Sequence, residues 1–258
     1  MKKLFALAAV ALTLCGLLTA CGSKNDTADD TGDAQDAQGG ETQKLIVGFD
    51  AEFPPFGFIA ADGTYDGFDL AMAKELCARL GWEYEAVAID WNSKDAELSS
   101  GTINCIWNGF TMNGREDDYT WSDPYVDNSQ VMVVSENSGI NSLSDLAGKT
   151  VGVQAASAAL DLLQSEEEGG QKELADTFAA LQQFPDYNNA FVELQAGSID
   201  AVAMDIGVAK YQLESRGEGY KILDEHLNSE KYAIGFKKGN TELCDKVNEG
   251  LQLSLIHI

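Results

Sequence analysis

Short runs of β-branched and apolar residues alternate with segments of helical periodicity from Lys44 onward. This alternation is typical of α/β proteins, in which helices cover both faces of parallel sheets. It occurs in two series, one before and one after the extended segment 126–135, so we predict two lobes. The predicted strands are residues 45–49, 83–89, 103–107, 150–154, 178–182, 201–204, 220–223 and 232–236, and the predicted helices are residues 70–80, 93–98, 157–163, 187–196, 206–214 and 241–252.

Capping residues support several of these helices. Asp69 precedes the first helix and Gly81 follows it, while Asp186 and Gly197 flank residues 187–196 in the same way. Ser142 stands before a further short helix that ends at Gly148. Polar N-caps and C-terminal glycines satisfy the backbone groups that a helix leaves unpaired at its ends. We therefore predict that Asp69, Ser142 and Asp186 are N-caps.

The first residues of the chain are typical of a bacterial export signal. Lys2 and Lys3 precede an apolar run over residues 4–18, which is shorter than a membrane span. The run ends in LTACG, which resembles a lipobox, and this predicts cleavage after Ala20 and a lipid anchor on Cys21. An ordinary signal peptide with an incidental cysteine is the alternative. We expect an extracytoplasmic lipoprotein at the outer face of the bacterial plasma membrane.

The segment after the signal is predicted to be an acidic tether. Residues 22–43 carry six acidic side chains and Lys24, and they include no aromatic or large aliphatic residue, so they cannot form a packed core. The whole chain has 42 acidic and 17 basic residues and a net charge of −25, which argues against nucleic acid as a partner.

Three cysteines remain in the predicted folded body, namely Cys77, Cys105 and Cys244. They lack the spacing of metal ligands, and we expect them to be small buried apolar residues, with a Cys77–Cys105 disulfide as the alternative. The only histidines are His226 and His257, and the chain has no GxSxG motif and no complete phosphate-binding loop. We therefore predict no catalytic residues, no metal and no cofactor.

Two charged residues that follow predicted strands stand out. Arg115 lies in a loop after the predicted strand 103–107, and Asp205 stands directly after the predicted strand 201–204. In open α/β sheets, ligands bind beyond the carboxyl ends of the strands. An amino-acid zwitterion needs a cation for its carboxylate and an anion for its ammonium, so these residues are candidates for binding both. The alternatives are a surface salt bridge of Arg115 with Asp117 or Asp118 and an N-cap role for Asp205.

Several ordered motifs resemble those of one family. They are VGFDAEFPPF at 47–56, GFDLA at 67–71, NGFT at 108–111 followed by Arg115, WSDPY at 121–125, VGVQ at 151–154 and DAVAMD at 200–205. Together they are similar to the extracellular solute-binding proteins of polar amino-acid ABC importers (periplasmic-binding-protein type II, family 3). Two departures are a shorter loop from Thr111 to Arg115 and the absence of the usual glycine and threonine from residues 154–158.

The resemblance implies a two-lobed fold in which two doubly wound sheets are joined by two hinge strands. Lobe 1 would comprise residues 44–127 and 230–258, and lobe 2 residues 128–229. It also implies roles for residues between the lobes. Arg115 would bind the α-carboxylate and Asp205 the α-ammonium, while Phe53 and Trp91 would enclose the side chain and Asp50 and Gln154 would face its far end. The remaining predicted ligand contacts are Asn108, Gly109, Thr111, Ser157 and Ala158.

The implied function is capture of a polar amino acid by a monomer that delivers it to the permease of an ABC importer. Arginine, lysine, histidine and glutamine are the favoured ligands, and cystine is a further one. An enzyme on the same fold, similar to prephenate or arogenate dehydratases, and a ligand-presenting sensory receptor are the alternatives. The last six residues, LSLIHI, match a translated sequencing adapter, so we expect residues 253–258 to be foreign to the protein.

Overall fold

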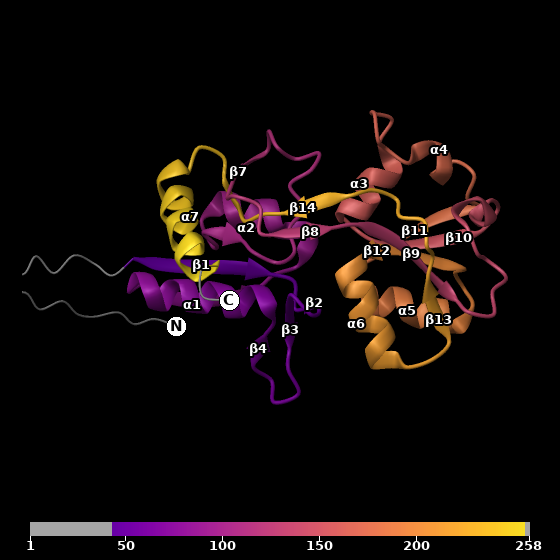
Figure 1. Ribbon diagram of the computed structural model, residues 1–258, viewed down its shortest axis with the longest axis horizontal. Helices are drawn as coiled ribbons and strands as arrows, with labels where there is room; N and C mark the ends of the chain where they lie inside the picture. Colours follow the sequence, from indigo (N-terminus) through magenta and orange to yellow (C-terminus); the bar gives the residue numbers. More distant parts are fainter. Residues whose placement is uncertain (1–42, 256–258) are drawn as a thin grey trace, which may run out of the picture. The chain divides into compact units, whose positions relative to one another are not determined.

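The fold is taken from a computed structural model that describes residues 43–255 (Figure 1). The predicted signal peptide, the lipidated Cys21 and nearly all of the tether lie outside the described residues, as do residues 256–258. Over residues 43–255, no helix has both the length and the apolar character that a membrane crossing requires.

The first large sheet has five strands in the order β5-β1-β6-β15-β7. Strand β1 is parallel to β5 and β6, whereas β15 is antiparallel to β6 and β7. The strands are β1 (Lys44–Phe49), β5 (Glu83–Ala88), β6 (Cys105–Ile106), β7 (Tyr119–Trp121) and β15 (Gly235–Lys237), and the helices of this part are α1 (Phe68–Leu80), the 3-10 helix η1 (Trp91–Ser93), α2 (Lys94–Ser100) and α7 (Thr241–Leu255).

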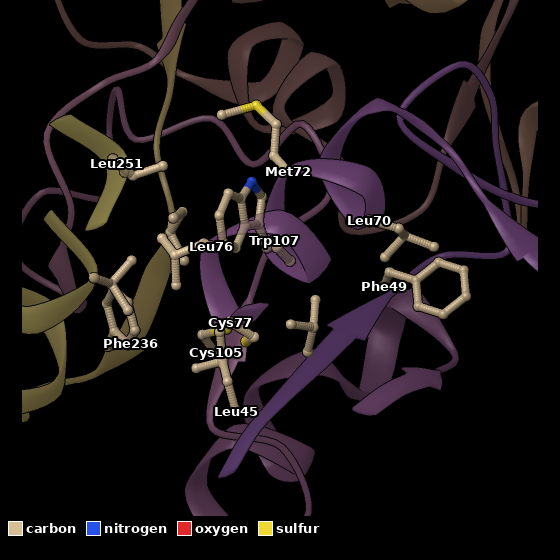
Figure 2. Close-up of a cluster of buried hydrophobic side chains, with 14 of the residues drawn as sticks. Leu45, Phe49, Leu70, Met72, Leu76, Cys77, Cys105, Trp107, Phe236 and Leu251 are labelled. Atoms are coloured by element: carbon tan, nitrogen blue, oxygen red, sulfur yellow. The ribbon is translucent and has the colours of Figure 1, made fainter. Parts of the chain in front are cut away.

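The hydrophobic core of this sheet joins residues from both ends of the chain (Figure 2). Trp107 is fully buried among side chains of α1, β1 and α7, including Leu76, Leu45 and Leu251. Cys77 and Cys105 belong to the same core, and both are free and buried. The prediction that these cysteines are small buried apolar residues is thus confirmed, and the disulfide alternative is wrong.

The second large sheet also has five strands, in the order β11-β10-β12-β9-β13. Strand β10 is parallel to β11 and β12, and β9 is antiparallel to β12 and β13. The strands are β9 (Gln130–Ser135), β10 (Thr150–Gln154), β11 (Ala180–Phe184), β12 (Ala201–Asp205) and β13 (Tyr220–Ile222), and the helices are the 3-10 helix η2 (Leu143–Leu146), α3 (Ala158–Gln164), α4 (Lys172–Ala175), α5 (Tyr187–Ala196) and α6 (Ile206–Arg216).

Two short strands connect the parts of the chain that form the two large sheets. The chain leaves β7 and reaches β9 through β8 (Val126–Asn128), and it returns from β13 to β15 through β14 (Glu230–Tyr232). Strands β8 and β14 pair antiparallel, which places Asn128 opposite Glu230 (Figure 1). A small third sheet is formed by β2 (Glu52–Phe53), β3 (Gly57–Ile59) and β4 (Tyr65–Asp66).

The relative direction of the strands differs from the prediction in both large sheets. Both are mixed, whereas the alternation of strands and helices predicted parallel sheets. Strands β9 and β15 run antiparallel to a neighbouring strand because each enters its sheet directly from a connecting strand, without a helical crossover. The strand predicted at 178–182 is observed two residues later, at Ala180–Phe184.

The predicted N-caps have different outcomes. Asp186 caps α5 by accepting a hydrogen bond from the Asn189 N–H, and Ser142 forms a capping box at η2, so both predictions are confirmed. The prediction for Asp69 is wrong, because Gly67 precedes α1 and no side chain caps this helix. The buried Asp69 carboxylate instead accepts hydrogen bonds from elsewhere in the chain, as described below.

Candidate functional site

Predicted site residues lie where strands of both large sheets end. Asp50 and Asn108 follow β1 and β6, and Gln154 and Asp205 are the last residues of β10 and β12. All four are buried, although each side chain is polar or charged. Buried polar groups need partners, so the hydrogen bonds of these residues show how the candidate site is organised.

Arg115 contacts residues from the regions around both of the large sheets. Its Nη2 lies 2.6 Å from Oδ2 of Asp161 in α3, and its Nη1 lies 3.5 Å from the backbone oxygen of Thr111. The guanidinium is largely buried, with 11% of the side chain exposed. Among the described residues, its only acidic partner is Asp161, so the alternative of a pair with Asp117 or Asp118 is wrong.

Lys94 lies beside Arg115, and sequence reasoning did not find it. Its Nζ donates a hydrogen bond to the Ala156 oxygen at 3.3 Å and lies 5.2 Å from the centre of the Trp91 ring. The same Ala156 oxygen lies 3.5 Å from Nη2 of Arg115. Burial lowers the pKa of Lys94, and the charge of Arg115 lowers it further. A lysine three residues after Trp91 is a weak sequence signal, because most lysines are exposed.

Asp205 is held by four donors. Its Oδ1 accepts hydrogen bonds from Asn128 Nδ2 at 2.8 Å, Gln130 Nε2 at 2.7 Å and Tyr232 Oη at 2.6 Å, and its Oδ2 accepts one from Tyr187 Oη at 3.3 Å. The side chain does not cap α6, so the N-cap alternative is wrong. Burial raises the pKa of Asp205 to about 6, and a second carboxylate close by raises it too.

That second carboxylate belongs to Glu230 in β14. Its Oε1 accepts hydrogen bonds from Asn128 Nδ2 at 2.7 Å and Gln130 Nε2 at 2.8 Å, the same two amide groups that donate to Asp205. Thr111 Oγ1 donates a third bond at 2.7 Å. Asp205 and Glu230, called here the carboxylate pair, therefore share a set of donors. Glu230, Asn128 and Gln130 were not predicted from the sequence, because the pairing of β8 with β14 brings them together.

Asp50 and Gln154 are joined by a hydrogen bond between their side chains. Gln154 Nε2 donates hydrogen bonds to Asp50 Oδ2 at 2.7 Å and to the Pro185 oxygen at 3.1 Å. The Glu52 N–H donates to Asp50 Oδ1 at 2.9 Å. Burial raises the pKa of Asp50 to about 6. The structure thus brings these two predicted residues into direct contact.

The predicted aromatic walls belong to separate hydrophobic clusters. Phe53 packs with Tyr187 at a centroid distance of 6.0 Å, whereas Trp91 packs edge-to-face with Phe110 at 5.6 Å. Gly109 lies against Phe53, because a Cβ at position 109 would come within 2.8 Å of that ring. Phe53 and Trp91 thus pack against different residues at the candidate site.

Asp69 positions the loop that carries Gly109 and Thr111. Its Oδ2 accepts hydrogen bonds from the Gly109 N–H at 2.5 Å and from Tyr125 Oη at 2.8 Å. Gly109 has φ +56°, which glycine adopts more easily than other residues. Burial raises the pKa of Asp69 to about 7. This acidic residue of the GFDLA motif therefore acts on the loop rather than on its own helix.

The other predicted contacts are placed as follows. Asn108 lies against Gly57, and its amide atoms have no hydrogen-bond partner within residues 43–255. Ser157 caps α3 by accepting a bond from the Leu160 N–H at 3.1 Å, and Ala158 is the first residue of that helix. In the described part of the chain, no group of three or more His, Cys, Asp or Glu side chains could hold a metal ion.

A hollow of about 410 Å³ lies next to the carboxylate pair. It is lined by Asn128 and Glu230, by their chain neighbours, and by Asn113 and Ile206, whereas Asp205 does not line it. Another hollow, of about 430 Å³, is lined by residues such as Asp95 and Lys237 and includes none of the predicted site residues.

Comparison with known families agrees with this geometry. A model of the bacterial extracellular solute-binding proteins, family 3, matches residues 45–254. The chain belongs to this family. Family 3 proteins have the two-lobed type II periplasmic-binding-protein fold, and the described part of this chain has that fold. Its place in an extracellular solute-binding family implies an extracytoplasmic location.

Individual relatives of this family 3 protein are amino-acid-binding proteins. The arginine-binding extracellular protein ArtP of Bacillus subtilis is 33% identical over 98% of this chain and 92% of its own length. A substrate-binding protein of an ABC uptake transporter from Streptococcus pneumoniae, solved with bound histidine, is 34% identical. It has a TM-score of 0.77 and covers 83% of this chain and 87% of its own.

A third relative, an ancestral arginine-binding protein bound to glutamine, is 35% identical with a TM-score of 0.74, covering 83% of this chain and 92% of its own. These relatives are binding proteins, and the present chain is likewise a binding protein and not an enzyme. The dehydratase alternative is therefore wrong.

Proposed function

We propose that this chain captures a polar amino acid between two lobes and delivers it to the permease of an ABC importer. The observation that carries the proposal is the position of Thr111 between opposite charges. Its backbone oxygen lies 3.5 Å from Arg115 Nη1, and its hydroxyl donates to Glu230 of the carboxylate pair at 2.7 Å. A small zwitterion placed at Thr111 reaches a cation with its carboxylate and an anion with its ammonium.

The roles of the site residues follow from this placement. Arg115 binds the α-carboxylate. Asp205 binds the α-ammonium, with Gly109 and Thr111 as further contacts. Burying either ligand charge without a partner costs several kcal/mol, so both residues are required for binding. The remaining proposed contacts are Phe53, Trp91 and Asn108 along the ligand, and Ser157 and Ala158 near its carboxylate.

The side chain of the ligand is proposed to extend toward Asp50 and Gln154. Asp50 accepts hydrogen bonds, and Gln154 both donates and accepts them, which suits a guanidinium, an ammonium, an imidazole or an amide. We therefore propose arginine, lysine, histidine or glutamine as the ligand, with cystine as a further candidate. The arginine, histidine and glutamine that the relatives bind support this choice.

Calorimetric titration with the twenty amino acids and cystine tests the proposal. We expect tight 1:1 binding of one or a few of these ligands by the wild-type chain. Arg115→Ala and Asp205→Asn are each expected to abolish this binding, whereas Arg79→Ala, on the exposed face of α1, retains it. Absence of binding to all of these ligands would overturn the proposed function. Near-native affinity in either site variant would overturn the role of that residue.

We also propose lobe boundaries and a mechanism of closure. Residues 44–127 and 230–258 form lobe 1, residues 128–229 form lobe 2, and the protein acts as a monomer. Arg115 and Thr111 lie in lobe 1 and Asp205 in lobe 2, so a ligand that contacts both stabilises a closed state that the permease recognises. Small-angle scattering with and without ligand tests this. An unchanged radius of gyration on saturation with ligand would contradict closure.

Lipid anchoring at Cys21 is a separate proposal, supported by the lipobox-like sequence LTACG. Expression in a bacterium that is fed labelled palmitate should label the wild-type chain and leave Cys21→Ser unlabelled. The variant should also move from the membrane fraction to the soluble fraction. Equal labelling of both chains would show that Cys21 is not the lipidated residue.

A further inference from the structure

Lys94 is a buried cation without an acidic partner. About 5% of the residue is exposed, and Lys94 forms no ion pair within residues 43–255. Its one described hydrogen bond is donated to the Ala156 oxygen at 3.3 Å, although an ammonium carries three donors. The Trp91 ring at 5.2 Å stabilises the cation from one side. Burying a charge with so few partners is unfavourable, so the position is suited to an anion that comes from outside the chain.

The charges around Lys94 point to the same conclusion. Arg115 already has an anionic partner, because Asp161 lies 2.6 Å from its Nη2. These two groups together have no net charge, and Arg115 alone would therefore leave a carboxylate ligand with nothing to neutralise it. Adding Lys94 gives the group of three side chains one net positive charge. A single carboxylate restores neutrality.

The geometry allows one carboxylate to reach both cations. Lys94 Nζ lies 3.3 Å and Arg115 Nη2 lies 3.5 Å from the same Ala156 oxygen. The two nitrogens are thus close enough for the two oxygens of one carboxylate to accept from each of them. Ala156 has φ +54° and is the one non-glycine residue of the described chain with positive φ, so its carbonyl is held in an unusual orientation.

We propose that Lys94 is a second cationic contact for the ligand carboxylate, beside Arg115, and that it makes the site selective for ligands with a free carboxylate. This inference rests on the proposed function. The Ala156 oxygen holds the two cations together before binding. The ligand carboxylate then accepts hydrogen bonds from both of them. Amides and esters of the same amino acid lack the charge that Lys94 requires.

The test compares an amino acid with its carboxamide. The probe is whichever of L-arginine, L-lysine, L-histidine and L-glutamine the wild-type chain binds most tightly, and both forms are titrated calorimetrically. Lys94→Met keeps the apolar contact with Trp91, and Lys94→Gln keeps a donor for the Ala156 oxygen. Both should weaken binding of the acid by about 10- to 100-fold, as expected for loss of a charge-assisted hydrogen bond, and that of the carboxamide by less than about twofold.

Two variants serve as controls. Lys94→Arg restores the charge and should recover most of the affinity for the acid, and Lys210→Met removes an exposed lysine of α6 and should change nothing. Affinity for the acid within about twofold of wild type in both uncharged variants would overturn the inference. Equal weakening of acid and carboxamide would also overturn it, because this indicates a structural role. A wild-type chain that binds none of the twenty amino acids and no cystine would instead refute the proposed function.

Discussion

Replacing Asp205 by Asn tests whether burial of the carboxylate pair opposes folding at neutral pH. Oδ1 of Asp205 accepts three of the four hydrogen bonds, and Oδ2 accepts only the long one from Tyr187. An asparagine amide with its oxygen in place of Oδ1 keeps those three bonds, and its Nδ2 can donate to Tyr187 Oη. The substitution therefore removes a negative charge beside Glu230 while the network is retained.

The sign of the pH dependence follows from the pKa of Asp205, which is raised from 3.8 to about 6. Between these values the folded chain holds a proton that the unfolded chain has lost. Stability from this group is thus greatest at low pH and is lost as the pH rises through about 6. The carboxylate opposes folding by roughly 3 kcal/mol at pH 8 and by about half of that at pH 5.

Urea unfolding of the wild type and of Asp205→Asn at both pH values measures this difference without ligand. We expect Asp205→Asn to stabilise the chain more at pH 8 than at pH 5, by roughly 1–2 kcal/mol. Groups away from the carboxylate pair titrate in both proteins and cancel in the comparison. Asp224→Asn, at an exposed position, is the control and should show no such difference. If the stability of Asp205→Asn parallels that of the wild type at both pH values, the buried charge of Asp205 does not oppose folding.

Three further predictions concern the part of the chain around the first sheet. Asp69→Ala leaves the Gly109 N–H and the Tyr125 hydroxyl without their acceptor and should lower the free energy of unfolding by about 2–4 kcal/mol in urea titrations. A loss below about 1 kcal/mol would contradict the role of Asp69 in holding the Gly109 loop. Gly109→Ala places a Cβ 2.8 Å from Phe53 at φ +56° and should lower the melting temperature in differential scanning calorimetry, with Gly63→Ala, in open space, as the milder comparison. The thiols of Cys77 and Cys105 should react with a thiol reagent only after unfolding, since burial raises their pKa values; rapid reaction in the native chain would contradict this.

Much of the local structure could be predicted because it depends on neighbouring residues. Helix α5 begins at Tyr187 and ends at Ala196, as the cap at Asp186 and the glycine at 197 indicate. The same local rule failed for Asp69. This carboxylate is buried against Gly109, forty residues away in the chain, and a buried acid bonds to whichever donors the fold places beside it.

The sequence by itself determined the α/β class, the division into two series, the family and the strand-end positions of Arg115 and Asp205. These follow from periodicity, capping and motifs, which are local properties. Only the tertiary structure decided the partners of these charges. The antiparallel pairing of β8 with β14 sets Glu230 beside Asp205, and the packing of α2 brings Lys94 to Ala156. Such partners are distant along the chain, and burial then fixes their charge and pKa, because a group removed from water depends on the few groups that surround it.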